Sequence, residues 1–193
     1  NEFVELREML MQEMISWKHV LSPEDYCSIP FINADGYHSK TVAYSIWHII
    51  RIEDIVVNSL IRRKKEVLYE NNFDKKIGAD IITTGNELVK QEIAEFSKKL
   101  NIEALYEYAL SVKASTDEWL KSIHYEDIKK KFGDDDKKRI SELGVVSDDE
   151  SAVWLIDYWC NKDISGLIKM PLSRHWIMHI EAANRIKEKL LDK

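Results

Sequence analysis

The chain has few of the residues that interrupt helices. Its 193 residues include 6 glycines and 3 prolines, whereas 32% of them are charged and 45% are hydrophobic. Few breakers and many charges favour long amphipathic helices over strands, so we expect an all-α fold. A chain of this length can bury a full hydrophobic core, and we expect residues 1–193 to form a single domain.

Cysteine and long apolar runs are also scarce. Cys27 and Cys160 are the two cysteines, and no CxxC spacing links them, so we expect reduced thiols. No stretch is apolar and uncharged for long enough to span a bilayer, and the charged N-terminal residues do not resemble a signal peptide. These features predict a soluble cytoplasmic protein without a membrane partner.

Positive charge is in deficit, because 28 basic residues face 34 acidic ones, which gives a net charge of −6 and a pI near 5.6. Contact with nucleic-acid phosphates needs a basic surface, so we expect no nucleic-acid partner. The run RRKK at residues 62–65 is a local exception. It falls at the expected end of a helix, where cations stabilise the negative end of the dipole; a phosphate-binding patch is the alternative.

Several familiar catalytic motifs are missing. The sequence has no HExxH, GxGxxG, P-loop or GxSxG motif, which argues against a zincin, a nucleotide-binding protein or a serine hydrolase. No histidine has glutamate three residues before it, which excludes the Glu-x-x-His pattern of ferritin-like di-iron bundles.

Apolar periodicity predicts four principal helices, over residues 2–21, 40–64, 102–122 and 171–190. Four such helices in one chain make a four-helix bundle the expected architecture.

Local signals predict further boundaries. Asn101 is a cap for the third principal helix, and the TGNE and SDDE sequences at 84–87 and 147–150 are capping boxes. The boxes predict shorter helices, one to about residue 99 and one ending before Gly166, although the first could be continuous with 102–122. The charged residues 125–146 predict a long surface loop.

The last helix carries two histidines on its apolar side. His175 precedes His179 by one turn, so both rings project from the same face. Such a pair arises by chance about 0.18 times in this composition, so the pair alone is weak support for a metal site. The apolar stripe around His179 consists of Leu172, Trp176, Ala183, Ile186 and Leu190.

His48 is the expected third member of the group, because it lies in the most apolar helix between Trp47 and Ile49. Buried imidazoles need polar partners, and one metal ion would satisfy all three histidines. Three ligands leave an open position, which is typical of catalytic metals. Hydrogen-bonded core histidines are the alternative. Glu53 points about 140° away from His48 around the helix, so we expect it to pair elsewhere.

Three segments resemble the DinB-like superfamily, in that family's order. Residues 44–54, YSIWHIIRIED, resemble its second helix; LYEYA at 105–109, followed by T-x-x-WL at 116–120, resembles its third; and HWIMH at 175–179 resembles its C-terminal HxxxH. The resemblance spans residues 35–190. It implies a four-helix bundle with a crossover connection, plus short extra helices, and a metal site formed by His48, His175 and His179.

The resemblance also implies a function, because members of the superfamily are similar to S-transferases and isomerases that use low-molecular-weight thiols. We therefore expect a divalent ion, Zn or Ni above all, to hold a thiol and present its thiolate to a small electrophilic substrate; a hydrolase-like reaction is a variant. Three imidazoles also suit Cu or Fe. A homodimer is expected as well.

Some features limit these expectations. The sequence IEAA at 180–183 replaces a Gly-Gln-Ile-like run of the family, so the substrate is not implied. Tyr44, Arg174 and Trp176 are near enough in sequence to line a pocket, or simply to pack. The alternative function is a non-catalytic bundle with a structural metal or a polar histidine cluster, acting as a dimeric stress-associated binding module. An accessible cavity at the histidines would favour the enzyme.

Overall fold

The computed structural model describes residues 2–192, and within that range the chain is helical. Its regular elements are α-helices, 3-10 turns and two π-helical segments, and one isolated bridge joins Lys131 and Asp163. The all-α prediction is confirmed. None of the described helices combines the length and the apolar character needed to cross a bilayer.

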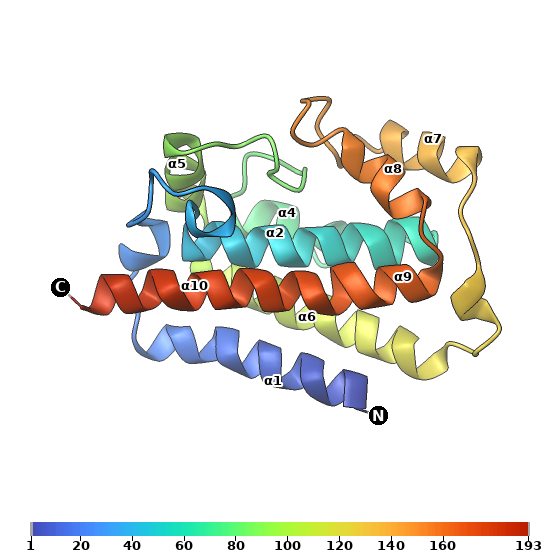
Figure 1. Cartoon of the computed structure of the whole chain (residues 1–193), viewed down its shortest axis with the longest axis horizontal. Helices are drawn as coiled ribbons and strands as arrows, with labels where there is room; N and C mark the ends of the chain where they lie inside the picture. The colour runs from blue at the N-terminus through green and yellow to red at the C-terminus, as the bar shows by residue number, and fades with distance from the viewer. Residues whose placement is uncertain (1, 193) are drawn as a thin grey trace.

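Four long helices form the bundle: α1 (Glu2–Ser16), α2 (Val42–Asp54), α6 (Ile102–Ser122) and α10 (His175–Leu191). α2 and α1 each contact both α6 and α10. In Figure 1, α1 and α10 run in one direction and α2 and α6 in the other. Because α2 and α6 run in the same direction, the chain between them must return along the bundle, which is consistent with the expected crossover connection.

α2 is the central helix, and every one of its residues is buried. Thr41 is the N-cap of α2, and its hydroxyl accepts a hydrogen bond from the Tyr44 N–H at 2.9 Å. The predicted helix over 40–64 is α-helical only to Asp54, since Ile55–Ile61 forms a π-helix. π-helical turns are rare and occur frequently at functional sites.

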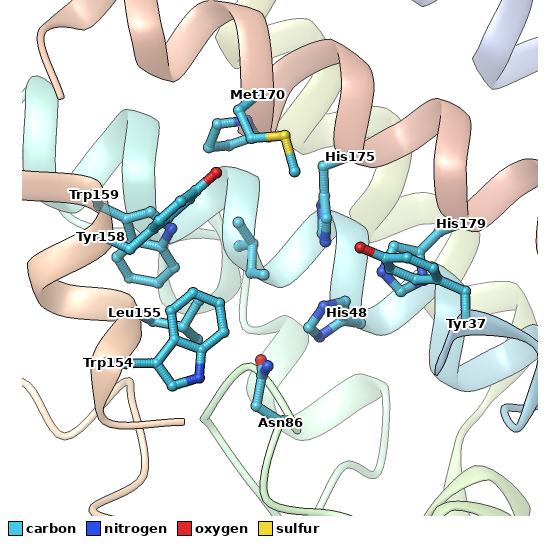
Figure 2. A pocket seen from close by; sticks show the side chains of 12 residues that line it. Tyr37, His48, Asn86, Trp154, Leu155, Tyr158, Trp159, Met170, His175 and His179 are labelled. Carbon is cyan, nitrogen blue, oxygen red and sulfur yellow. The ribbon is translucent and has the colours of Figure 1, made fainter. Parts of the chain in front are cut away.

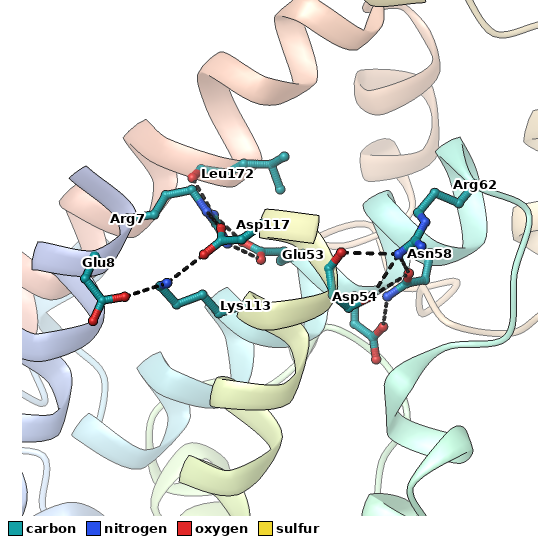
Figure 3. A network of polar contacts seen from close by, with 10 residues as sticks. Arg7, Glu8, Glu53, Asp54, Asn58, Arg62, Lys113, Asp117 and Leu172 are labelled. Atoms are coloured by element: carbon teal, nitrogen blue, oxygen red, sulfur yellow. Dashed lines mark hydrogen bonds and ion pairs between the residues drawn. The ribbon is translucent and has the colours of Figure 1, made fainter. Parts of the chain in front are cut away.

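One buried guanidinium joins the bundle helices (Figure 3). Arg7 of α1 donates to both carboxylate oxygens of Glu53 in α2, at 2.6 and 2.9 Å, and to Asp117 of α6 at 2.8 Å. It also donates to the Leu172 carbonyl, just before α10, at 2.9 Å. The expectation that Glu53 pairs away from His48 is thus confirmed.

The crossover contains three short helices: α3 (Val67–Glu70), α4 (Phe73–Lys76) and α5 (Gln91–Lys99). The predicted capping box at 84–87 is wrong, since α5 begins at Gln91. Glu87 instead accepts from the Thr83 hydroxyl, and Gly85 adopts a left-handed φ of +79°, so this segment is a loop.

The end of the crossover matches the sequence signal. Asn101 accepts from the Ala104 N–H at 3.1 Å and caps α6, as predicted, so α5 and α6 are separate helices. The basic run lies just after the π-helix, as expected. Arg62 donates to the Ser115 hydroxyl at 2.8 Å, and Arg63 pairs with Asp136 at 2.9 Å.

The connection from α6 to α10 also contains short helices: α7 (Asp134–Glu142), α8 (Trp154–Cys160) and α9 (Ile164–Lys169). The prediction of a surface loop over 125–146 is therefore wrong in part. Asp136 accepts from the Gly133 N–H at 3.2 Å at the start of α7, and Ile140 is fully buried in a core cluster that it shares with Ile55.

The predicted capping box at 147–150 is wrong too, because α8 begins only at Trp154. Asp163 is the observed cap in this region, and its carboxylate accepts from the Gly166 N–H at 2.8 Å. Gly166 therefore lies inside α9 rather than after a helix. The π-helical segment Met170–Arg174 follows α9 and leads directly into α10.

Candidate metal centre

The three predicted histidines meet between α2 and α10. One nitrogen atom from each of His48, His175 and His179 lies within 4.8 Å of the other two. The ring centroids are 4.6–5.0 Å apart, and Figure 2 shows the rings turned toward one another. The exposed fractions of the three residues are 5%, 8% and 2%, respectively. The structure thus brings together the complete set that the sequence predicted.

Helical geometry explains this convergence. His175 and His179 are one turn apart on α10, so they share the face that packs against α2. His175 is the first residue of α10 and follows the π-helical segment Met170–Arg174. The wider turns of a π-helix change the direction in which the next side chains point.

Thr84 orients the His48 ring. The His48 Nδ1 atom lies 2.7 Å from the Thr84 carbonyl oxygen. A carbonyl can only accept, so Nδ1 carries the proton and Nε2 keeps its lone pair. Histidines that ligate metals commonly donate their other nitrogen to such an acceptor, which fixes the tautomer and the ring.

The two α10 histidines have no such partner among the described residues. The His175 Nδ1 atom and both ring nitrogens of His179 are buried without a hydrogen bond. Leaving a polar atom buried and unpaired costs about 1–3 kcal/mol. A group that could supply the missing interactions is therefore expected at this point.

Burial keeps all three imidazoles neutral. Desolvation lowers the pKa of His48 to about 4, although the hydrogen bond to Thr84 opposes this shift. Desolvation also lowers the pKa of His175 and His179 well below the usual value, and the neighbouring rings add to this effect by repulsion between like charges. The neutral imidazole is the form that binds metals.

A divalent ion fits this donor set. Tetrahedral coordination with bonds of about 2.1 Å sets ligand nitrogens roughly 3.4 Å apart, so closure from 4.8 Å needs movements of only about 1.4 Å. No cysteine or carboxylate of the described residues belongs to the group. The site therefore offers three neutral nitrogen ligands and leaves a further coordination position to a molecule from outside the chain.

A cavity of about 220 Å³ adjoins the triad (Figure 2). Its other walls are mainly aromatic and apolar, and no lysine, arginine or carboxylate lines it within the described range. Such walls suit an uncharged apolar group. Besides the three histidines, the lining residues are Tyr37, Ile52, Asn86, Trp154, Leu155, Tyr158, Trp159, Met170 and Pro171.

Two loop residues of this wall were missed by the sequence analysis. The Tyr37 ring meets the His179 ring edge-on, with centroids 4.6 Å apart, and Asn86 lies across the cavity near His48 (Figure 2). Tyr37 belongs to a single 3-10 turn, Gly36–His38, and Asn86 to an irregular segment, so no periodic pattern marks them. The turn signal at Gly36 lies beside Tyr37 but does not reveal where the loop packs.

Tyr44, Arg174 and Trp176, which the sequence placed near enough to line a pocket, occupy different environments. Tyr44 stacks on His48 with ring centroids 5.5 Å apart. Trp176 is fully buried beneath the Arg7 guanidinium, at 4.9 Å from its ring centroid, and Arg174 is exposed. Only Tyr44 therefore adjoins the triad, whereas Trp176 packs in the core.

Comparison with known proteins supports the fold. No family model matches the sequence, and neither does any curated protein. A crystal structure described as that of the conserved protein of locus from Enterococcus faecalis is similar, with a TM-score of 0.66 at 14% sequence identity. The match covers 99% of this chain and 96% of that one. The chain is thus an all-α protein whose buried histidine group could hold a divalent metal.

Proposed function

We propose that the chain is a divalent-metal-binding protein of the DinB-like superfamily and acts as a thiol-dependent S-transferase. His48, His175 and His179 are the proposed ligands, and Zn or Ni the proposed ion. The observation that carries the proposal is the meeting of three neutral, buried imidazoles beside a cavity, with three of their nitrogens unpaired.

The cavity favours an enzyme over a structural metal. Structural zinc sites are closed by four protein ligands, whereas catalytic sites use three and keep one position for water or substrate. Only three ligating groups of the described residues gather here, and all three line the cavity. A small molecule inside the cavity would therefore have direct access to the open position.

The residues around the triad have separable roles. The Thr84 carbonyl holds the His48 ring and its tautomer. A divalent ion would lower the pKa of a low-molecular-weight thiol, so that it loses its proton to solvent as a thiolate. The thiolate sulfur would then bond to an electrophilic carbon and displace a leaving group, which departs with the bonding electrons. The aromatic wall around Trp154 and Trp159 would hold the apolar part of the electrophile and exclude water. Asn86 supplies an amide for orienting it.

Conjugation assays test this proposal. Tag-free protein loaded with Zn or Ni is incubated with glutathione, cysteine or 2-mercaptoethanol and with the electrophiles 1-chloro-2,4-dinitrobenzene or monochlorobimane. We expect thioether formation above the uncatalysed rate, lost on chelation and in His48→Ala, His175→Ala and His179→Ala. The matched control is His19→Ala, which removes an exposed histidine and should retain activity. Metal-loaded protein that accelerates none of these reactions would count against S-transfer.

A further inference from the structure

A second cavity, of about 270 Å³, also reaches the triad. It shares His48, His179, Tyr37 and Asn86 with the first cavity, but none of the α8 residues lines it. Its remaining lining residues are Gly36, Ser39, Lys40 and Tyr44. The triad is therefore accessible from an aromatic cavity and from a more polar one.

Lys40 gives the polar cavity its chemical character. It is the one charged residue that lines either cavity within the described range. Its Nζ atom lies 5.1 Å from the centroid of the Tyr44 ring, and the Tyr44 ring in turn stacks on His48. Lys40, which precedes α2, thus begins a column that continues through Tyr44 and His48 on one side of α2, from the cation to the triad.

This ammonium group has no anionic partner on the described part of the chain. No carboxylate of residues 2–192 lies within ion-pair distance of Lys40, whereas the buried Lys113 pairs with both Asp117 and Glu8, at 2.6 and 2.8 Å. Lys40 is half-buried, and burial lowers its pKa without a neighbouring carboxylate to raise it. A partly desolvated cation without a counter-ion is unfavourable, and an anionic ligand would relieve that cost.

We propose that Lys40 is an anion-binding residue of this site, and that the thiol substrate carries a carboxylate that pairs with Lys40 while its sulfur reaches the histidine triad. This inference rests on the proposed thiol-dependent function. The Nζ-to-Tyr44 and Tyr44-to-His48 separations, 5.1 and 5.5 Å, place the ammonium at most about 10.6 Å from the His48 ring. An extended thiol of several carbons can span the two groups even at this upper limit.

Cobalt-substituted protein provides a spectroscopic test that does not depend on catalysis, because a thiolate bound to Co(II) gives a charge-transfer band. The probes are 6-mercaptohexanoate and 6-mercaptohexanol, which match in length and differ in charge. We expect the acid to bind about tenfold more tightly than the alcohol, as for a partly buried charge-assisted contact. Lys40→Met should remove this preference, and Lys40→Arg should restore most of it.

Lys162→Met is the matched control, since the Lys162 Nζ atom lies 4.1 Å from the ring centroid of Tyr158, which lines only the aromatic cavity. The control should keep the tenfold preference. Equal binding of acid and alcohol by the parent would overturn the inference, and so would a preference that survives Lys40→Met but disappears in Lys162→Met. Either result would leave metal and thiol binding intact.

Further outcomes distinguish failure of the thiol-dependent function from failure of the anion site. If cobalt binds but no thiol produces the band, thiol dependence is contradicted, and the visible cobalt bands can report binding of plain hexanoate. If Lys40→Met weakens hexanoate binding, the anion site stands and the carboxylate belongs to another substrate. If Lys40→Met leaves hexanoate binding unchanged, the anion site is overturned as well. Failure of cobalt to bind would contradict the proposed function and, with it, this inference.

Discussion

Two buried polar clusters share helix α2, and they differ in how their polar atoms are satisfied. Around Arg7, all three guanidinium nitrogens donate to Glu53, Asp117 or the Leu172 carbonyl (Figure 3). In the histidine triad, the Thr84 carbonyl holds one ring nitrogen, and three others are buried without a partner. The first cluster is complete within the chain, whereas the second leaves three nitrogens without a partner among the described residues.

This difference separates residues that maintain the fold from residues that bind. Burial of polar groups is costly unless they are paired, so a satisfied network contributes to a unique packing of helices. An unsatisfied group next to a cavity stores part of that cost until a ligand binds. Mutations in the two clusters should therefore affect different properties.

The largest expected effect on stability is that of Arg7→Met. The substitution leaves the carboxylates of Glu53 and Asp117 buried without their cation, so the free energy of unfolding should fall by about 3–5 kcal/mol. Urea unfolding followed by circular dichroism measures this change. The control Arg185→Met removes an exposed pair with Glu181 and should cost less than about 1 kcal/mol. Equal losses would show that the Arg7 network does not hold the helices together.

Metal binding should have the next largest effect. With free ion at about a thousand times its dissociation constant, the free energy of unfolding should rise by about 4 kcal/mol, because only the native state assembles the site. Thermal unfolding with Zn or Ni and with a chelator measures the difference. His175→Ala should show no difference, whereas His124→Ala, which alters an exposed histidine, should respond like the parent. If neither Zn nor Ni changes the thermal unfolding of the parent, binding of these ions to the native state would be contradicted.

His179→Leu provides the sharpest contrast with Arg7→Met. Leucine is apolar and similar in size, so it removes two buried, unpaired nitrogens from the metal-free protein. We expect the free energy of unfolding of the metal-free variant to stay the same or rise by about 1 kcal/mol, while metal binding is lost. Chemical denaturation in the presence of a chelator measures this. A loss approaching that of Arg7→Met would mean that the triad is a structural cluster.

Tyr44→Phe should have the smallest effect. The Tyr44 hydroxyl donates to the Gly85 carbonyl at 2.9 Å, next to Thr84, which orients His48. Losing this bond should cost about 1 kcal/mol of stability and weaken metal binding roughly threefold to tenfold. Tyr106→Phe is the matched control. Its hydroxyl donates to the Met14 carbonyl at 2.8 Å, away from the triad, so metal affinity, measured by titration, should not change.

The sequence predicted the parts of the fold that depend on helical periodicity. The stripe from Leu172 to Leu190 is buried as expected, and Asn101 caps α6, because both signals act within one helix. The histidine group was also predicted, since two of its members are one turn apart and His48 lies in the most apolar helix.

Features that depend on tertiary contacts were not predicted. α7 is mostly charged, and Ile140 is its one buried apolar residue, so the segment looked like a loop. The two capping boxes failed because Glu87 accepts from Thr83, and because the Ser147 hydroxyl accepts from the Asp149 N–H within a turn, so neither side chain caps a helix. Tyr37 lies in a short 3-10 turn, and only the packed structure places it at the triad.

The metal content of tag-free protein, measured by elemental analysis, is the most direct test of the central claim that the triad is a metal site. We predict about one divalent ion per chain in the parent, lost in His48→Ala, His175→Ala and His179→Ala alike. His124→Ala should retain it. A correctly folded parent that contains no metal and takes up neither added Zn nor added Ni would contradict the claim, and the three histidines would then be core residues of a bundle that acts elsewhere.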